Sequence, residues 1–215
     1  MELLKKTAAL RIEQQTLNIP QEDVTNISLS DVPLLPERIA CFTALSHLTL
    51  VSMKPKLKTL LAIPLDTLKS LRMLDVSDNN ITVSADETLP VYPTMRKLFI
   101  ANNKINQWSE MERLATAFPN VEVLDAANNN AYDCSRRAEV FELFPKLSVL
   151  DSMSKDGREV AVLDTDEDSS DEEDGDDDDD ESFQSFVIGE ECEDDGSESD
   201  SEDDDEPPSK VVRTE

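Results

Sequence analysis

Three stretches of the chain repeat one pattern: LRMLDVSDNNI at residues 71–81, MRKLFIANNKI at 95–105 and VEVLDAANNN at 121–130. Each begins with an apolar residue, has further apolar residues three and five positions later, and carries an asparagine eight positions after the first residue. Weaker copies begin at Val24 and Leu45, and a truncated copy begins at Leu147. The six starts are separated by 21, 26, 24, 26 and 26 residues, a regularity that predicts stacked structural repeats.

This period and the recurring leucines are typical of leucine-rich repeats. They predict an α/β solenoid of about five repeats, in which each copy contributes one short parallel strand, with neighbouring strands about 4.8 Å apart. One repeat cannot bury its apolar side alone, so the two ends of the stack need caps. Asn79, Asn103 and Asn129 lie in register, and we expect their amides to bond the backbone of the turn after each strand.

Both ends of the repeat region contain segments that can serve as caps. The pattern of residues 2–16 predicts an amphipathic helix. Its inward-facing residues are expected to be Leu3, Leu4, Ala8 and Ile12. A C-terminal cap is expected at about 132–155, with a helix from about 135 to 144. That helix would present three apolar residues to the last repeat: Val140, Phe141 and Phe144.

Two serines precede a glutamate by three positions inside the return segments. Ser84 with Glu87 and Ser109 with Glu112 match the S-x-x-E capping box that opens a helix. We therefore expect a return segment, helical or irregular, to open at each of these serines.

Charge is distributed very unevenly along the chain. Residues 164–206 hold 26 acidic residues and no Lys, Arg or His, whereas residues 1–163 hold 21 acidic and 18 basic residues. A block of like charge with few apolar groups does not recover the entropy lost on ordering. The sequence therefore predicts a repeat domain over residues 1–163 and a disordered acidic tail over 164–215.

The acidic tail narrows the choice of partners. A polyanion repels nucleic acid and anionic membranes and attracts basic proteins. We therefore expect a basic protein partner, no direct contact with nucleic acid or membrane, and a monomeric chain. Six tail residues have an acid three positions later, as acidophilic kinases prefer: Thr165, Ser169, Ser170, Ser197, Ser199 and Ser201. An apolar island between two acidic blocks is interpreted as a short recognition motif: Phe183, Phe186, Val187 and Ile188.

Catalytic and metal-binding patterns are missing from the sequence. Its three cysteines are far apart, and its one histidine, His47, has no nucleophile pattern around it. No stretch of 18 apolar residues indicates a membrane span. We expect a non-enzymatic protein with no cofactor, in a reducing compartment.

Strand residues between the core positions point to the opposite face of the predicted sheet. One resulting column places Asp75, Phe99, Asp125 and Asp151 on adjacent strands, and Met73 and Val123 lie in the column beside it. Like charges so close together cost stability unless a cation or donor arrives. The face is therefore a candidate site for a basic, partly apolar segment. The alternative is that each aspartate only bonds the nearby backbone.

The segment VFELFPKLSVLD, residues 140–151, matches a C-terminal cap pattern of apolar residues, proline and a final Leu-Asp. With this cap and the acidic tail, the whole chain resembles the acidic leucine-rich nuclear phosphoprotein 32 family. Two positions depart from the family pattern: Arg136 stands where a tyrosine is usual, and Ser152 where a glycine is usual.

The resemblance implies a non-enzymatic regulator. Members of that family bind core histones as chaperones or acetylation blockers, inhibit protein phosphatase type 2A, and shuttle between nucleus and cytoplasm. The expected function is therefore that of a histone-binding nuclear regulator, with an inhibitor or regulatory scaffold of the phosphatase as the alternative. A spliceosomal or RNA-associated adaptor would need a basic patch, which the sequence does not show.

Overall fold

The computed structural model describes residues 2–131 and 134–160. The chain divides into two units, 1–165 and 166–215, and all described residues belong to the first. The predicted acidic tail, with its apolar motif at 183–188 and its candidate phosphorylation sites, lies outside the described residues.

Within the described part, seven strands form a single sheet whose spatial order equals their order in the chain. Strands β1 to β6 pair in parallel and β7 pairs antiparallel with β6. This arrangement confirms the predicted leucine-rich repeat solenoid. The strand bounds are β1 Asn26–Ser30, β2 His47–Val51, β3 Met73–Asp75, β4 Lys97–Phe99, β5 Val123–Asp125, β6 Val149–Leu150 and β7 Met153–Ser154.

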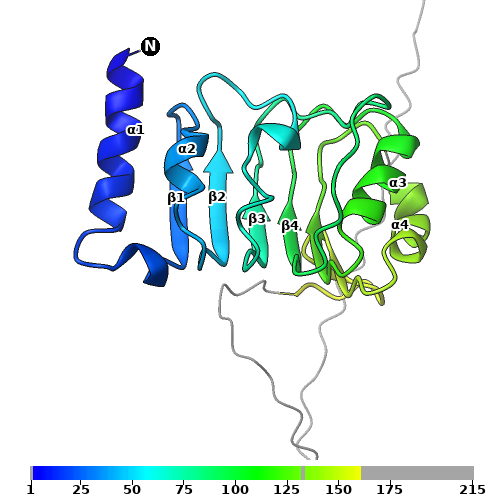
Figure 1. Ribbon diagram of the computed structural model, residues 1–215. Helices are drawn as coiled ribbons and strands as arrows, with labels where there is room; N and C mark the ends of the chain where they lie inside the picture. The colour runs from blue at the N-terminus through cyan, green and yellow to red at the C-terminus, as the bar shows by residue number, and fades with distance from the viewer. Residues whose placement is uncertain (1, 132–133, 161–215) are drawn as a thin grey trace, which may run out of the picture. The chain divides into compact units, whose positions relative to one another are not determined.

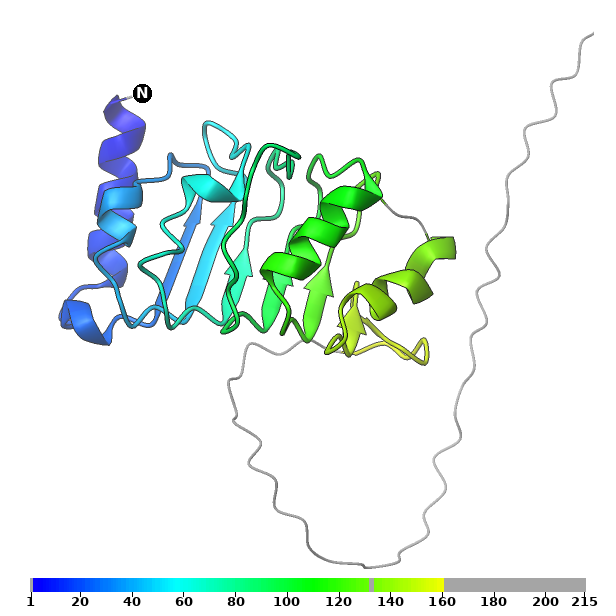
Figure 2. The same ribbon diagram turned by 45° about the vertical axis from the view of Figure 1, so that its right-hand side comes forward.

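The return segments that connect the strands contain short helices. Figure 1 and Figure 2 show α2 and α3 on the same side of the sheet, α1 beside β1 at one end, and α4 at the other end. Crossovers between adjacent parallel strands share one hand, so the connections gather on one side. The helix bounds are α1 Glu2–Gln15, η1 Gln21–Asp23, α2 Pro36–Ile39, η2 Leu60–Ala62, α3 Trp108–Ala117, η3 Cys134–Arg136 and α4 Arg137–Leu143.

The core lies between the sheet and these return segments. Leu48, Leu74, Leu98 and Leu124 are successive partners across β2 to β5, and each is fully buried. The apolar residue two positions later in each strand is buried as well. The residues between them point to the other side of the sheet, as the alternation of side chains in a strand requires.

A column of buried asparagines runs along the turns that follow the strands. Asn103 accepts a hydrogen bond from the backbone N–H of Ile81 at 2.9 Å, and its amide nitrogen donates to the carbonyls of Val76, Ile100 and Ala101 at 3.1, 2.9 and 3.1 Å. Asn79 and Asn129 make the corresponding bonds, each to its own repeat and to the preceding one. The predicted structural role of this column is confirmed.

The N-terminal cap satisfies the edge of the sheet with side chains. The Gln15 amide donates to the carbonyl of Ser28 at 2.7 Å and accepts from its N–H at 2.7 Å, while Arg11 donates to the carbonyl of Ser30. These bonds occupy backbone groups that an edge strand would otherwise expose. Ala8 and Ile12 are buried as predicted, but the prediction for Leu3 and Leu4 is wrong, because both are exposed.

The capping box predicted at Ser109 is also wrong in position. Helix α3 begins at Trp108, and its capping box joins Gln107 to Glu110, two residues before the predicted pair. Glu110 is buried and accepts hydrogen bonds from the N–H groups of Val83, Asn106 and Gln107, which ties α3 to the preceding repeat. The return segment that opens at Ser84 is irregular and begins with a turn, in which the Glu87 N–H bonds the Ser84 carbonyl at 3.1 Å.

The C-terminal cap covers the last repeat with α4 and a hairpin. Val140, Phe141 and Phe144 are buried, as predicted. The Arg137 guanidinium donates to the carbonyls of Leu150, Met153 and Ser154 at 3.0, 2.8 and 3.1 Å, which fastens α4 to β6 and β7.

Candidate partner-binding face

The side of the sheet opposite α2 and α3 is formed by the alternate residues of the strands, and we call it the strand face. Asp75 of β3 is in register with Phe99 of β4, which is in register with Asp125 of β5. An aromatic ring therefore lies between two carboxylates on adjacent strands. All three side chains are half-buried. The structure thus brings together three of the predicted site residues in the predicted order.

The apolar column beside these residues is less accessible than expected. Met73 is in register with Lys97, and Lys97 with Val123. Met73 is only 9% exposed, so it packs against its neighbours and offers little surface, whereas Val123 is half-buried.

Asp151 does not continue the column as a strand residue. Strand β6 ends at Leu150, and Asp151 and Ser152 have φ values of 49° and 61°, in the left-handed region. The chain needs this conformation to turn back into the antiparallel strand β7. The Asp151 carboxylate accepts a hydrogen bond from the N–H of Ala126 at 2.8 Å. Asp151 therefore still lies beside β5 and close to Asp125, although it belongs to a turn and not to a strand.

Burial raises the pKa of Asp125 above its ordinary value, and the nearby carboxylates of Asp151 and Asp75 raise it further. The N–H of Ala127, which donates to Asp125 at 3.2 Å, acts in the opposite direction. Asp75 likewise accepts from the N–H of Ser77 at 2.9 Å. The aspartates therefore bond the nearby backbone, as the alternative interpretation expects, and their role in binding a basic segment stays a prediction.

Lys97 is a residue of the strand face that was not among the predicted site residues. This residue lies on the strand face between Met73 and Val123, so the face carries a positive charge among its acids. Its position in the same alternating pattern as Phe99 was a sufficient signal. The strand face is therefore a mixed surface with carboxylates and one aromatic ring in its middle.

Other features of the described residues do not suggest chemistry. Across residues 2–131 and 134–160, no three His, Cys, Asp or Glu side chains come close enough together to hold a metal ion. In the same residues, none of the helices has both the length and the apolar character needed to cross a bilayer.

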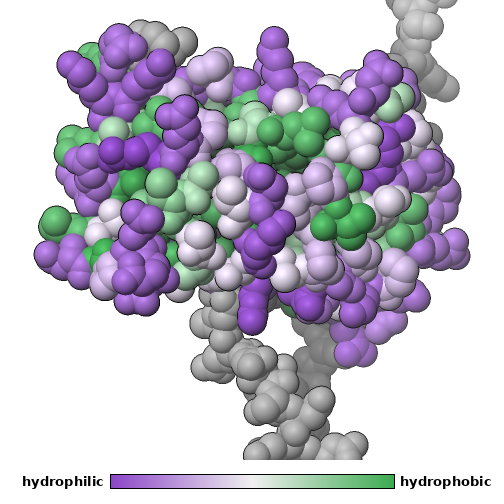
Figure 3. All heavy atoms as spheres, viewed as in Figure 1, coloured by the Kyte–Doolittle hydropathy of each residue, from purple (hydrophilic) through white to green (hydrophobic). Residues whose placement is uncertain are grey.

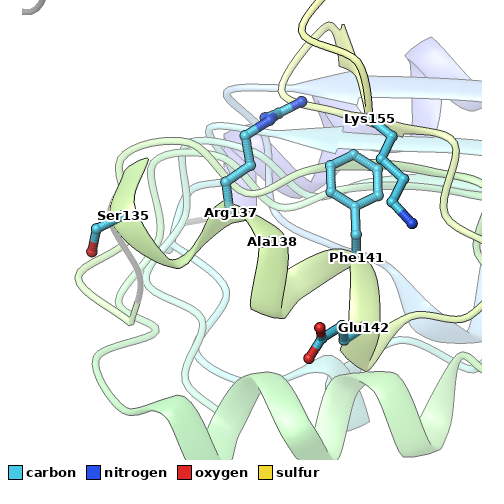
Figure 4. Close-up of a pocket in the computed structure, with 6 residues that line it drawn as sticks. All are labelled: Ser135, Arg137, Ala138, Phe141, Glu142 and Lys155. Carbon is cyan, nitrogen blue, oxygen red and sulfur yellow. The ribbon is translucent and has the colours of Figure 1, made fainter.

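A hollow of about 390 Å³ lies against α4 and is lined by Ser135, Arg137, Ala138, Phe141, Glu142 and Lys155. Figure 4 shows the Arg137 guanidinium and the Phe141 ring on the same side of α4, with Lys155 beyond the ring. The guanidinium lies 5.2 Å from the ring centre and makes the three carbonyl bonds of the cap. Its hydrogen bonds thus serve the fold, and we assign no ligand to this hollow.

The fold defines the chain as a leucine-rich repeat protein. No known family model matches it, and no curated protein is detectably similar in sequence. Among solved structures, it is similar to an internalin from Listeria monocytogenes, at 18% identity over 59% of this chain and 40% of the internalin, with a TM-score of 0.38. It is also similar to the Drosophila melanogaster SNF/U2A' complex, at 18% identity over 64% of this chain and 74% of that one, with a TM-score of 0.32. The chain thus spans less than half of the internalin's length.

Proposed function

We propose that this protein is a non-enzymatic, histone-binding nuclear regulator of the chaperone or acetylation-blocking type, which moves between nucleus and cytoplasm. The observation that carries the proposal is the row Asp75–Phe99–Asp125 on the strand face, with the pKa of Asp125 raised by burial and by neighbouring acids. Such a row favours a lysine or arginine side chain set against an aromatic ring.

Two physical effects act together at this row. A bound cation lowers the electrostatic cost of keeping Asp125 charged beside Asp151 and Asp75. The face of the Phe99 ring attracts the same cation, an interaction of about 0.5–2 kcal/mol depending on how far it is desolvated. A basic segment with small apolar residues would satisfy both the carboxylate charge and the ring of Phe99.

The acidic segment supplies the second part of the mechanism. Its 26 acids over residues 164–206 stand in for the phosphates of DNA on a basic protein. This contribution weakens with salt, since screening acts over about 8 Å at physiological ionic strength. We propose that the tail attracts core histones and that the strand face adds a contact less sensitive to salt.

The test is a titration of core histones with the full chain at about 0.3 M salt, where exposed charges are largely screened. Phe99→Ala and Asp125→Lys are expected to weaken binding at least about tenfold, a loss of about 1.4 kcal/mol. Leu61→Ala and Glu112→Lys are matched controls, because both residues are exposed on the return segments. Melting temperatures of all four variants should stay close to that of the parent.

Equal affinity of parent and Phe99→Ala at this salt concentration would mean that the strand face takes no part in histone binding. If histones then bound only through residues 164–215, the strand face would be left for another partner. The phosphatase alternative would next be tested by asking whether the same variants relieve inhibition of protein phosphatase type 2A.

A further inference from the structure

The N-terminal helix α1 carries apolar residues on two opposite sides. Ala8 and Ile12 face the repeat core and are buried. Leu3, Leu10 and Leu17 are 77%, 53% and 70% exposed. A surface helix normally has one apolar stripe, with charged and polar residues opposite it. The outer side of α1 departs from this rule.

The three exposed leucines are spaced by seven residues, so they line one side of the helix. Leu17 follows the last helical residue, and the Thr16 N–H still bonds the Ile12 carbonyl at 3.0 Å, which extends the helical turn toward it. Figure 3 shows hydrophobic residues beside hydrophilic ones at the end of the molecule formed by α1. Terminal repeats usually present a polar outer face, because it is exposed to solvent.

Opposite charges flank the leucine row, and their arrangement makes this surface complementary to the same surface of a second copy. In a helix, Lys6 and Glu13 lie on the same side of the row, four residues before Leu10 and three residues after it. A two-fold axis at Leu10 brings Lys6 of each copy toward Glu13 of the other copy. Glu13 also pairs with Arg38 at 2.7 Å, but both side chains are largely exposed, so this pair contributes little to stability.

We propose that the outer side of α1 binds the same surface of a second copy, with the two helices antiparallel. Leu10 then meets Leu10 of the second copy, Leu3 meets Leu17, and Lys6 meets Glu13. The proposal replaces the expectation of a strictly monomeric chain.

The pairing is expected to be weak and reversible. A helix of 14 residues is about 21 Å long, so one such contact buries less area than a standard stable interface of about 1,600 Å². The strongly acidic segments of the two copies also repel each other, and salt reduces that repulsion. We therefore expect dimers at high protein concentration, favoured by moderate salt.

Sedimentation of the full chain from about 1 to about 500 µM, a range that captures weak association, tests this directly. At about 0.3 M salt the parent is expected to shift from monomer to dimer with a dissociation constant of about 10–100 µM. Leu10→Glu should abolish the shift and keep the melting temperature, because it places like charges at the two-fold axis. Leu61→Glu is the matched control, since Leu61 is a similarly exposed leucine outside α1, and it should dimerise as the parent does.

A charge exchange tests the antiparallel geometry. Lys6→Glu and Glu13→Lys should each dimerise more weakly alone, because each variant sets like charges against each other. An equimolar mixture of the two should recover a dimer, because opposite charges then meet at both positions. A parent chain that stays monomeric throughout the range, equal loss in Leu61→Glu, or a mixture no stronger than its components would overturn the proposal.

Discussion

Two columns of polar residues cross the same repeats only a few residues apart along the chain, and they have opposite roles. Asn79, Asn103 and Asn129 are buried, and their amides are bonded to backbone groups of two successive repeats. Asp75 and Asp125 are half-buried on the other side of the sheet, and each accepts a bond from the backbone of its own strand end.

The difference lies in what each polar group leaves unsatisfied. An asparagine has both donors and acceptors, so it can match the mixed N–H and C=O groups of a turn in the core. A carboxylate accepts hydrogen bonds only, and next to other carboxylates it gains from an external cation. The asparagines therefore hold the repeats together, whereas the aspartates are the residues to which the proposed function assigns a basic partner.

Placing a carboxylate in the asparagine column gives the largest expected loss of unfolding free energy. Asn103→Asp would place a carboxylate against the carbonyls of Val76, Ile100 and Ala101, which need a donor. We expect a loss of about 3–5 kcal/mol at pH 7, as for an uncompensated buried charge. Chemical denaturation measures it.

Burial should raise the folded-state pKa of the introduced carboxyl, so the loss should shrink as pH falls toward its unfolded value of about 3.9. An equal loss at pH 7 and pH 4 would argue against a buried charge as its cause. The variant Asn103→Ala controls for loss of the amide alone.

Neighbouring strand residues on opposite sides of the sheet should differ by a smaller amount. Leu124 is fully buried, so Leu124→Ala is expected to cost about 2–5 kcal/mol of unfolding free energy. Phe99→Ala, on the strand face, should cost about 1 kcal/mol or less. Equal costs in urea denaturation would show that the strand face also belongs to the core.

A glycine in the turn after β6 is expected to change the stability by an intermediate amount. Ser152 has a φ of 61°, a left-handed conformation that costs a residue with a Cβ about 1 kcal/mol or more. Ser152→Gly should therefore stabilise the protein by about 0.5–1 kcal/mol after the greater entropy loss of glycine is counted. A rise in melting temperature would support this, and Ser148→Gly, at an exposed position next to β6, should lower it.

The smallest effect is expected from Asp125→Asn, the reverse exchange. The pKa of the Asp125 carboxyl in the folded protein is raised above the usual value of 3.8, so the folded state binds this proton more tightly than the unfolded chain does. The resulting penalty is full above the folded pKa and disappears as pH falls to the unfolded value. Asp125→Asn should stabilise by about 0.5 kcal/mol at pH 7, the scale of exposed charge pairs. The gain should vanish near pH 3.5, and a gain that is independent of pH would point to another cause.

Prediction from the sequence was most successful where local pattern and structure coincide. The period of the leucines predicted the parallel register, and the asparagine positions predicted the buried column. It failed at Ser109, because the true cap Gln107 pairs with a buried Glu110 that also bonds Val83 of the preceding repeat. It failed at Leu3 because Leu3 lies on the opposite side of α1 from Ala8 and Ile12, the two residues that face the core.

The sequence by itself determined the repeat, the register of the strands through Leu150, and the two polar columns, because these follow from spacing along one chain. Only the tertiary structure decided that Asp151 lies in a turn and not in a strand, since the turn from β6 into β7 depends on how α4 and Arg137 cover the last strand. It also decided that Met73 is packed and that Leu3, Leu10 and Leu17 are exposed. Accessibility depends on which neighbouring segments cover a residue, and that arises from contacts between residues far apart in the chain.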